Sequence, residues 1–180
     1  MCATQGTNHK LYFAYGSNLS CTQMKKRCPG AAPVALGHLR GWRWIINERG
    51  FANIVEDPAA AAADNDNKAS APGVYGVLYT LPPDDEAELD VHEGVPTAYE
   101  KEMLDVEVVQ GTTGSSENDE YRQYEQQTLV YIDYHRVKAD SPRPEYVSRM
   151  DRGIAEARRD WSLPDWYIDQ VMRKFIPEAS

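Results

Sequence analysis

The sequence predicts an α+β fold in which a small mixed or antiparallel β-barrel is flanked by helices. Three observations support this prediction. Apolar and polar residues alternate along several segments, which is the pattern of half-buried strands. Segments with this pattern outnumber those with helical spacing. They also do not alternate regularly with helices, as the strands of a parallel α/β sheet would.

The expected strands follow one another along most of the chain. They cover residues 11–15, parts of 33–47, 52–56, 73–81, 98–109 and 122–135. The first is a short apolar and aromatic run, LYFAY, of the kind that a buried strand prefers. The clearest alternation lies in the segment YEKEMLDVEVV, where acidic residues separate Leu104, Val106 and Val108. That strand is therefore expected to have one buried and one exposed face.

Apolar residues at helical spacing predict three helices and a further amphipathic segment. Residues 20–28 form the first helix, and residues 84–92 form the second, which begins with acidic residues suited to a helix N-terminus. The third has the clearest apolar stripe, at i, i+3 and i+7 spacing, through Val147, Met150, Ile154, Ala157 and Trp161. The further segment, residues 165–175, follows Pro164.

Size and composition favour one domain covering residues 1–180. The chain has 180 residues, of which 42% are hydrophobic, enough for a substantial core. Residues 1–9 are expected to be a flexible N-terminus. Residues 57–72 and 111–120 have low complexity or are rich in Gly, Ser and acids, and they are expected to be surface loops. Each loop is either a decoration or a lid.

Charge and cysteine content limit the partners and the compartment. The net charge of −9 argues against nucleic-acid and anionic-membrane binding, because both partners are negative. No signal peptide and no apolar run of membrane-spanning length is visible. Three cysteines are too few for a disulfide framework. The protein is therefore expected to be cytoplasmic.

Residue types that commonly carry chemistry do not occur in informative patterns. Cys21 and Cys28 lie on the apolar face of the helix expected over 20–28, where they are expected to pack in the core. The four histidines are scattered, and no HExxH or CxxC spacing indicates a metal site. No Walker-type or GxGxxG loop indicates a nucleotide site.

Two local features remain as candidate sites. Gly16 can adopt backbone shapes closed to other residues, and the turn that it begins can present backbone N–H groups to an anion. An ordinary strand-to-helix turn would have the same sequence pattern. Glu93 ends the helix expected over 84–92, where the helix dipole does not favour a carboxylate. It is either a solvated surface acid or a general base in a pocket, with a pKa raised by burial.

Together these segments resemble a known family. LYFAYGSNL, LDVHEGV and AYEKEMLDVEV resemble the γ-glutamylcyclotransferase family of small AIG2-like barrel enzymes, over roughly residues 10–170. The resemblance implies that Glu93 is the general acid/base. It also implies a set of substrate-binding residues, with the spacing to Tyr99 one residue shorter than in the family: Tyr12, Phe13, Ala14, Tyr15, Gly16, Ser17, Asn18, Tyr99 and Tyr146.

The reaction implied by the resemblance converts a γ-glutamyl amino acid to 5-oxoproline and a free amino acid. The substrate's own α-amine attacks its γ-carbonyl, so no nucleophilic side chain, metal or cofactor is needed. Backbone N–H groups of the Gly16 turn would bind either the α-carboxylate or the developing oxyanion. Glutathione is expected to be a poorer substrate, because the resemblance is to the YGSN type and not to the glutathione-specific relatives.

Two alternatives to this function remain open at the level of sequence. One is a related enzyme, either a γ-glutamylamine cyclotransferase or a γ-glutamyl-processing enzyme of fungal-type secondary metabolism. The other is a non-catalytic small-molecule binding module, which would have no need of a general base at Glu93. The expected partner is a small γ-glutamyl compound, with no nucleic acid and no membrane, and a homodimer is left open.

Overall fold

Five strands close a barrel. The structure, a computed structural model, describes residues 9–62, 71–109 and 125–178. Around the barrel the strands are β1 (Lys10–Ala14), β5 (Val74–Leu81), β2 (Ala32–Leu39), β6 (Glu100–Val109) and β7 (Glu125–Ile132). Neighbouring strands are antiparallel except for β1 and β7, which are parallel and complete the closure. This arrangement confirms the predicted α+β fold with a small mixed barrel.

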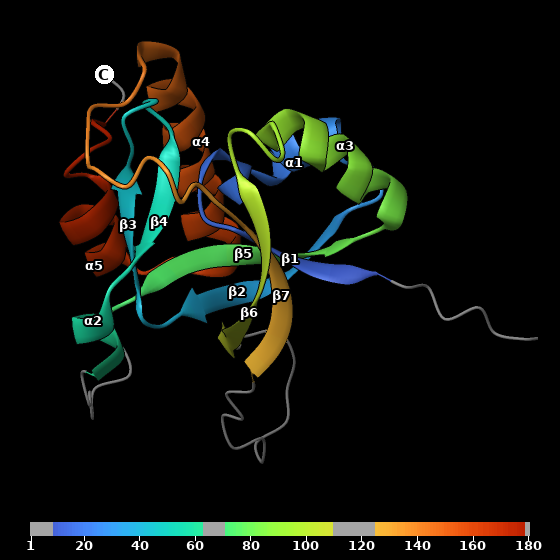
Figure 1. Cartoon of the computed structure of the whole chain (residues 1–180), viewed down its shortest axis with the longest axis horizontal. Helices are drawn as coiled ribbons and strands as arrows, with labels where there is room; N and C mark the ends of the chain where they lie inside the picture. Colours follow the sequence, from blue (N-terminus) through green and yellow to red (C-terminus); the bar gives the residue numbers. More distant parts are fainter. Residues whose placement is uncertain (1–8, 63–70, 110–124, 179–180) are drawn as a thin grey trace, which may run out of the picture.

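The other two strands form a separate hairpin. β3 (Trp42–Ile46) pairs antiparallel with β4 (Ala52–Glu56) in a two-stranded sheet that lies next to the C-terminal helices (Figure 1). The turn between them is closed by a hydrogen bond from the Gly50 N–H to the Asn47 carbonyl, at 2.8 Å. Gly50 has a φ of 82°, a conformation that favours glycine. Asn47 also donates its amide to Asp133 just beyond β7, which ties this turn to the end of the barrel.

The helices lie in two groups around the barrel. After the short 3-10 turn η1 (Ser17–Leu19), α1 (Cys21–Arg27) packs near α3 (Pro83–Glu93) on one side (Figure 1). The second group, at the left of Figure 1, contains α4 (Pro144–Trp161), α5 (Asp165–Tyr167) and a π-helical turn over Ile168–Met172, and α4 also contacts η1 and α1. These elements confirm the predicted helices to within a few residues. No helix among the described residues is long and apolar enough to cross a membrane.

One expected loop contains a helix. Residues 58–62 of the segment expected to be a loop form α2 (Pro58–Ala62). Pro58 occupies the first helical position, alanine has the highest helix propensity, and the Asp57 carboxylate accepts the Ala60 N–H at 3.3 Å. The expectation of a loop was therefore wrong for these five residues. The rest of that loop over 63–70, the whole of 111–120 and residues 1–8 of the N-terminus lie outside the described residues.

The core fills the barrel and the space beneath α4. Phe13 and Leu78 are fully buried, as are Met150 and Ala157 of the predicted α4 stripe. Cys28 is also fully buried, and Cys21 packs against the core from a partly exposed position. The helical faces predicted from apolar spacing are therefore the faces that pack inward.

Candidate active site

A cavity of about 180 Å³ lies where β1, the hairpin turn, α1, α3 and α4 meet. Nine of the ten site residues named from the sequence line it. The exception is Ala14, which is fully buried in β1 and pairs with Val77 of β5. The complete lining is Tyr12, Phe13, Tyr15, Gly16, Ser17, Asn18, Arg27, Arg49, Phe51, Ala52, His92, Glu93, Tyr99, Tyr131, Tyr146 and Arg149.

Glu93 is the only carboxylate among these lining residues. It is the last residue of α3, which Gly94 ends in a left-handed conformation with a φ of 67°. The Glu93 side chain is half-buried, and its Oε1 atom accepts a hydrogen bond from Asn18 Nδ2 at 3.3 Å. Burial raises the pKa of Glu93 to about 7, although the guanidinium groups of Arg27, Arg149 and Arg49 oppose this rise. A carboxylate in this state can exchange a proton near neutral pH.

Asn18 organises the side of the cavity next to Glu93. Its Nδ2 atom also donates to Tyr12 Oη at 3.0 Å, while its Oδ1 atom accepts from Gln23 Nε2 at 2.8 Å and Arg27 Nη1 at 3.2 Å. Because donors meet Oδ1 and acceptors meet Nδ2, the amide has one favourable orientation. The amide N–H that faces Glu93 is therefore held in place before any ligand binds.

Tyr146 joins three segments of the lining. Its hydroxyl oxygen accepts the backbone N–H groups of Ser17 at 3.2 Å and Ala52 at 3.4 Å. A Cβ atom on Gly16 would lie 2.9 Å from this oxygen and 3.1 Å from Ala52 Cβ. Glycine is needed here for space.

The structure gives a different reason for glycine at position 16 from the backbone freedom expected from the sequence. Gly16 has a φ of −109°, outside the left-handed region that would demand glycine. The Ser17 N–H, one of the groups expected to face an anion, points to the Tyr146 hydroxyl. The close approach of that hydroxyl to the β1 turn explains both observations.

Several tyrosines supply neutral hydroxyl groups. Burial raises the pKa values of Tyr12, Tyr99 and Tyr146 above the ordinary value of 10, so these hydroxyls keep their protons at neutral pH. Tyr99 Oη donates to the Ala52 carbonyl at 2.7 Å, which fixes its ring against the start of β4. The cavity can therefore hydrogen-bond polar groups while enclosing an aliphatic chain between rings.

Sequence reasoning missed the three arginines. Arg27 comes from α1, Arg49 from the hairpin turn and Arg149 from α4. Arg149 lies three residues after Tyr146 on one helix, so the i, i+3 rule could have identified it. Nothing in the local sequence distinguishes Arg49 from a solvated turn residue. Four further lining residues were also missed: Phe51, Ala52, His92 and Tyr131.

The described residues contain no cluster of three or more His, Cys, Asp or Glu side chains that could hold a metal ion. The chemistry that the lining residues themselves offer is proton transfer by Glu93, hydrogen bonding by amide and hydroxyl groups, and anion binding by arginine.

Comparison with known proteins identifies the family. The sequence model described as γ-glutamyl cyclotransferase, AIG2-like, matches residues 12–147, which is more than half of the chain. The chain belongs to this family. The match includes every site residue named from the sequence, from Tyr12 to Tyr146. No curated protein matches the AIG2-like chain by sequence.

Solved structures share the fold of this AIG2-like protein at low identity. A human protein described as uncharacterized, loc79017, superposes with a TM-score of 0.68 and 20% identity, covering 96% of this chain and 90% of the other. A structure described as γ-glutamyl cyclotransferase gives 0.67 and 21%, with the same coverage. YkqA from Bacillus subtilis superposes with a TM-score of 0.65 and 21% identity. The superposition covers 98% of this chain and 58% of YkqA. These similarities confirm the γ-glutamyl cyclotransferase-like barrel.

Proposed function

We propose that the protein converts γ-glutamyl amino acids to 5-oxoproline and the free amino acid. The observation that carries this proposal is Glu93, a half-buried carboxylate with a pKa of about 7 that lines a tyrosine-rich cavity. Membership of the γ-glutamyl cyclotransferase family supports the reaction class. A purely binding module would gain nothing from a carboxylate poised to exchange a proton.

The proposed reaction begins with proton transfer. Glu93 takes a proton from the substrate's α-ammonium group, and the freed amine attacks the γ-carbonyl carbon. The new C–N bond closes a five-membered ring, and Glu93 gives its proton to the leaving nitrogen as the bond from that nitrogen to the carbonyl carbon breaks. The second proton that the attacking nitrogen loses on becoming the lactam N–H passes through Glu93 to the released amine, which leaves as an ammonium group. Effective molarities for oriented intramolecular attack reach about 10⁵ M or more, so positioning supplies much of the acceleration.

The neighbouring groups would position the glutamyl part. The Asn18 amide beside Glu93 fixes the carboxylate, and the protonated hydroxyls of Tyr12 and Tyr99 are donors or acceptors near it. Phe13 and Tyr15 add apolar surface for the methylene groups of a glutamyl chain. The cavity of about 180 Å³ is compatible with a small dipeptide-sized ligand that extends toward solvent.

A substrate panel tests the proposal. The purified protein is incubated with several γ-glutamyl dipeptides, glutathione and ε-linked γ-glutamyl-lysine, and 5-oxoproline is measured. We expect release from the dipeptides and slower release from glutathione. Release from glutathione alone would show that the proposed substrate is wrong, and release from none of the compounds would reject the cyclotransferase reaction.

A further inference from the structure

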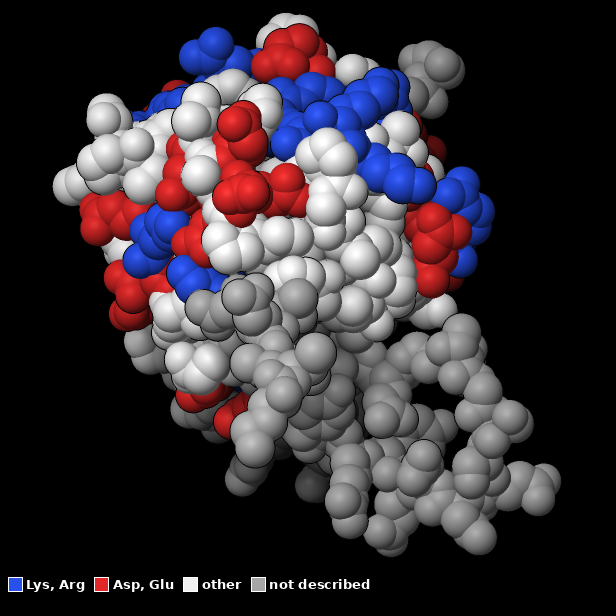
Figure 2. Space-filling view, turned by 90° about the vertical axis from the view of Figure 1, so that its right-hand side faces the viewer, with Lys and Arg blue, Asp and Glu red and all other residues white. Residues whose placement is uncertain are grey.

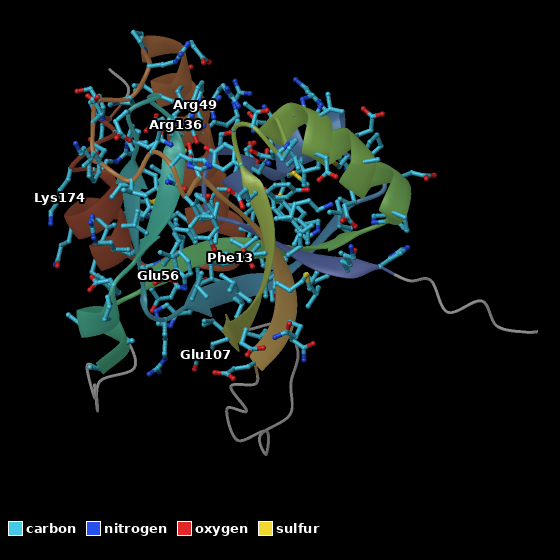
Figure 3. All side chains as sticks on the ribbon, in the orientation of Figure 1. Phe13, Arg49, Glu56, Glu107, Arg136 and Lys174 are labelled. Carbon is cyan, nitrogen blue, oxygen red and sulfur yellow. The ribbon has the colours of Figure 1, made fainter. Side chains whose placement is uncertain are left out.

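Arg49 is held in the cavity by the turn of the β3–β4 hairpin. Its backbone N–H donates to Asn47 Oδ1 at 3.1 Å, and its carbonyl accepts from Arg143 Nε at 2.8 Å. Its guanidinium lies 5.4 Å from the centre of the Phe51 ring and 5.8 Å from that of Tyr99. Figure 3 shows Arg49 near α4, on the side of the molecule away from the lower ends of the barrel strands. The position of this side chain is therefore defined by the turn and by two rings.

No acceptor within the described parts of the chain meets the guanidinium of Arg49. Among the described residues it forms no ion pair, and its buried Nη1 atom has no hydrogen-bond partner. A buried donor without an acceptor costs free energy, and the cost is larger when the group is charged. An anionic ligand in the cavity would remove that cost.

The other two arginines of the cavity are already engaged. Arg27 donates to Asn18 Oδ1, whereas Arg149 donates to Ser17 Oγ at 3.0 Å and pairs with Glu145 at 3.5 Å. The contacts with Asn18 and Ser17 lie in the turn that follows β1, next to the groups proposed to hold the glutamyl part. Arg49 enters from the hairpin turn and keeps unused donors.

The charge of the site favours a ligand with more than one carboxylate. Three guanidinium groups and one carboxylate line the cavity, although the whole chain carries a net charge of −9. Basic and acidic side chains lie side by side on the face seen in Figure 2. The last turn of α1 contains three basic residues, Lys25, Lys26 and Arg27. A γ-glutamyl amino acid has two carboxylates, whereas a γ-glutamylamine has one. Arginine binds a carboxylate through two parallel hydrogen bonds, which suits a planar group with free donors.

We propose that Arg49 is a specificity-determining residue that binds the carboxylate of the leaving amino acid. This inference rests on the proposed cyclotransferase function. It assigns the substrates to γ-glutamyl compounds in which a carboxylate lies next to the scissile amide nitrogen. It disfavours γ-glutamylamines, whose leaving groups have no such carboxylate.

A matched substrate pair tests the role of Arg49. γ-Glutamyl-alanine and γ-glutamyl-ethylamide differ only in the carboxylate of the leaving group, and γ-glutamyl-alaninamide keeps the size without the charge. We expect kcat/KM of the wild type to be about ten-fold or more higher for γ-glutamyl-alanine, as one charge-assisted contact allows. Arg49→Met should bring this ratio close to one. Arg43→Met, which alters an exposed arginine of the same hairpin outside the cavity lining, should leave the ratio unchanged.

Each other outcome has a definite meaning. A wild-type ratio near one overturns the inference, and so does a high ratio that persists in Arg49→Met. If Arg49→Met does not fold, the same ratio of kcat/KM values is measured for Arg49→Gln and compared with that of the wild type. A ratio that stays high in Arg49→Gln overturns the inference. If no compound yields 5-oxoproline, the proposed cyclotransferase function is rejected. Binding of γ-glutamyl-alanine and γ-glutamyl-ethylamide, measured by calorimetry, then tests whether Arg49 binds the carboxylate. Tighter binding of γ-glutamyl-alanine that the Arg49 variants lose supports the carboxylate site, and equal binding rejects it.

Discussion

Replacing Glu93 with Gln should remove most of the turnover and leave the fold intact. Gln has the same shape, and its Oε1 atom can still accept the Asn18 amide hydrogen that Glu93 accepts at 3.3 Å. It cannot take a proton from the α-ammonium group, and general acid–base catalysis contributes about 10²- to 10⁴-fold. We therefore expect kcat for 5-oxoproline release to fall by about that range. In the wild type, kcat/KM should rise with pH through about 7, as Glu93 loses its proton.

The raised pKa of Glu93 also fixes the sign of a stability change. The folded protein keeps a proton on Glu93 up to a pH of about 7, whereas the ordinary pKa of a glutamate is 4.5. Raising the pH across this window therefore destabilises the wild type through this group, by at most about 3 kcal/mol above pH 7. Gln does not titrate, so the variant avoids this loss. The Tm of Glu93→Gln minus the Tm of the wild type should therefore be larger at pH 8 than at pH 5.

A control on the same helix separates catalysis from general charge effects. Glu88 is exposed on α3 and does not line the cavity, so Glu88→Gln should keep normal turnover and the pH dependence of stability. The assignment of Glu93 as the base would be wrong if Glu93→Gln kept more than about a tenth of normal turnover, well above what the loss of a general base allows. A variant that fails to fold at either pH would instead make Glu93 a structural residue.

Four further perturbations test the site. Tyr146→Phe leaves the N–H groups of Ser17 and Ala52 without their acceptor, so we expect kcat/KM to fall several-fold and unfolding free energy to drop by about 1–3 kcal/mol in denaturant titrations. Gly16→Ala places a Cβ atom 2.9 Å from the Tyr146 hydroxyl, and displacement of that hydroxyl should lower kcat/KM more than the Phe substitution does; normal kinetics would show that the site tolerates the shift. Activity should survive EDTA, because no metal cluster occurs among the described residues, and zinc-dependent recovery after EDTA would contradict the proposed mechanism. It should also survive thiol alkylation at pH 7.5, since burial raises the pKa of Cys28 to about 11, whereas rapid inactivation of folded protein would implicate a cysteine.

Local sequence patterns predicted the elements that depend on local physics. The alternation through Leu104, Val106 and Val108 reflects the period of a strand, and β6 follows it over Glu100–Val109. The stripe through Met150 and Ile154 reflects the period of a helix, and α4 buries that face. Composition was a poorer guide at residues 58–62, where a run of alanines reads as low complexity but forms a helix.

Most of the lining residues named in advance came from the resemblance to the family, and local physical chemistry by itself singled out only Glu93 and the Gly16 turn. Glu93 was noticed because a carboxylate immediately before a helix-ending glycine has no capping role there. Arg49 was missed because its approach to the cavity depends on how the hairpin turn packs against Asp133 and Arg143, far along the chain. The reason for Gly16 was also inaccessible, because the atom that fills the space above it belongs to Tyr146. Contacts of this kind have no local signature.

The parallel pairing of β1 with β7 has a consequence for folding. Leu11 pairs with Thr128, so the first strand of the chain finds its second barrel neighbour only after all the other strands have been synthesised. Closing so long a loop costs chain entropy before the contact repays it, which makes this pairing a late event. Tyr12 and Tyr131, on these two strands, both line the cavity, and their rings lie 5.7 Å apart. The cavity therefore takes shape with barrel closure, and a ligand that fills it stabilises the closed barrel over partly folded forms in which β1 has only β5 as a neighbour.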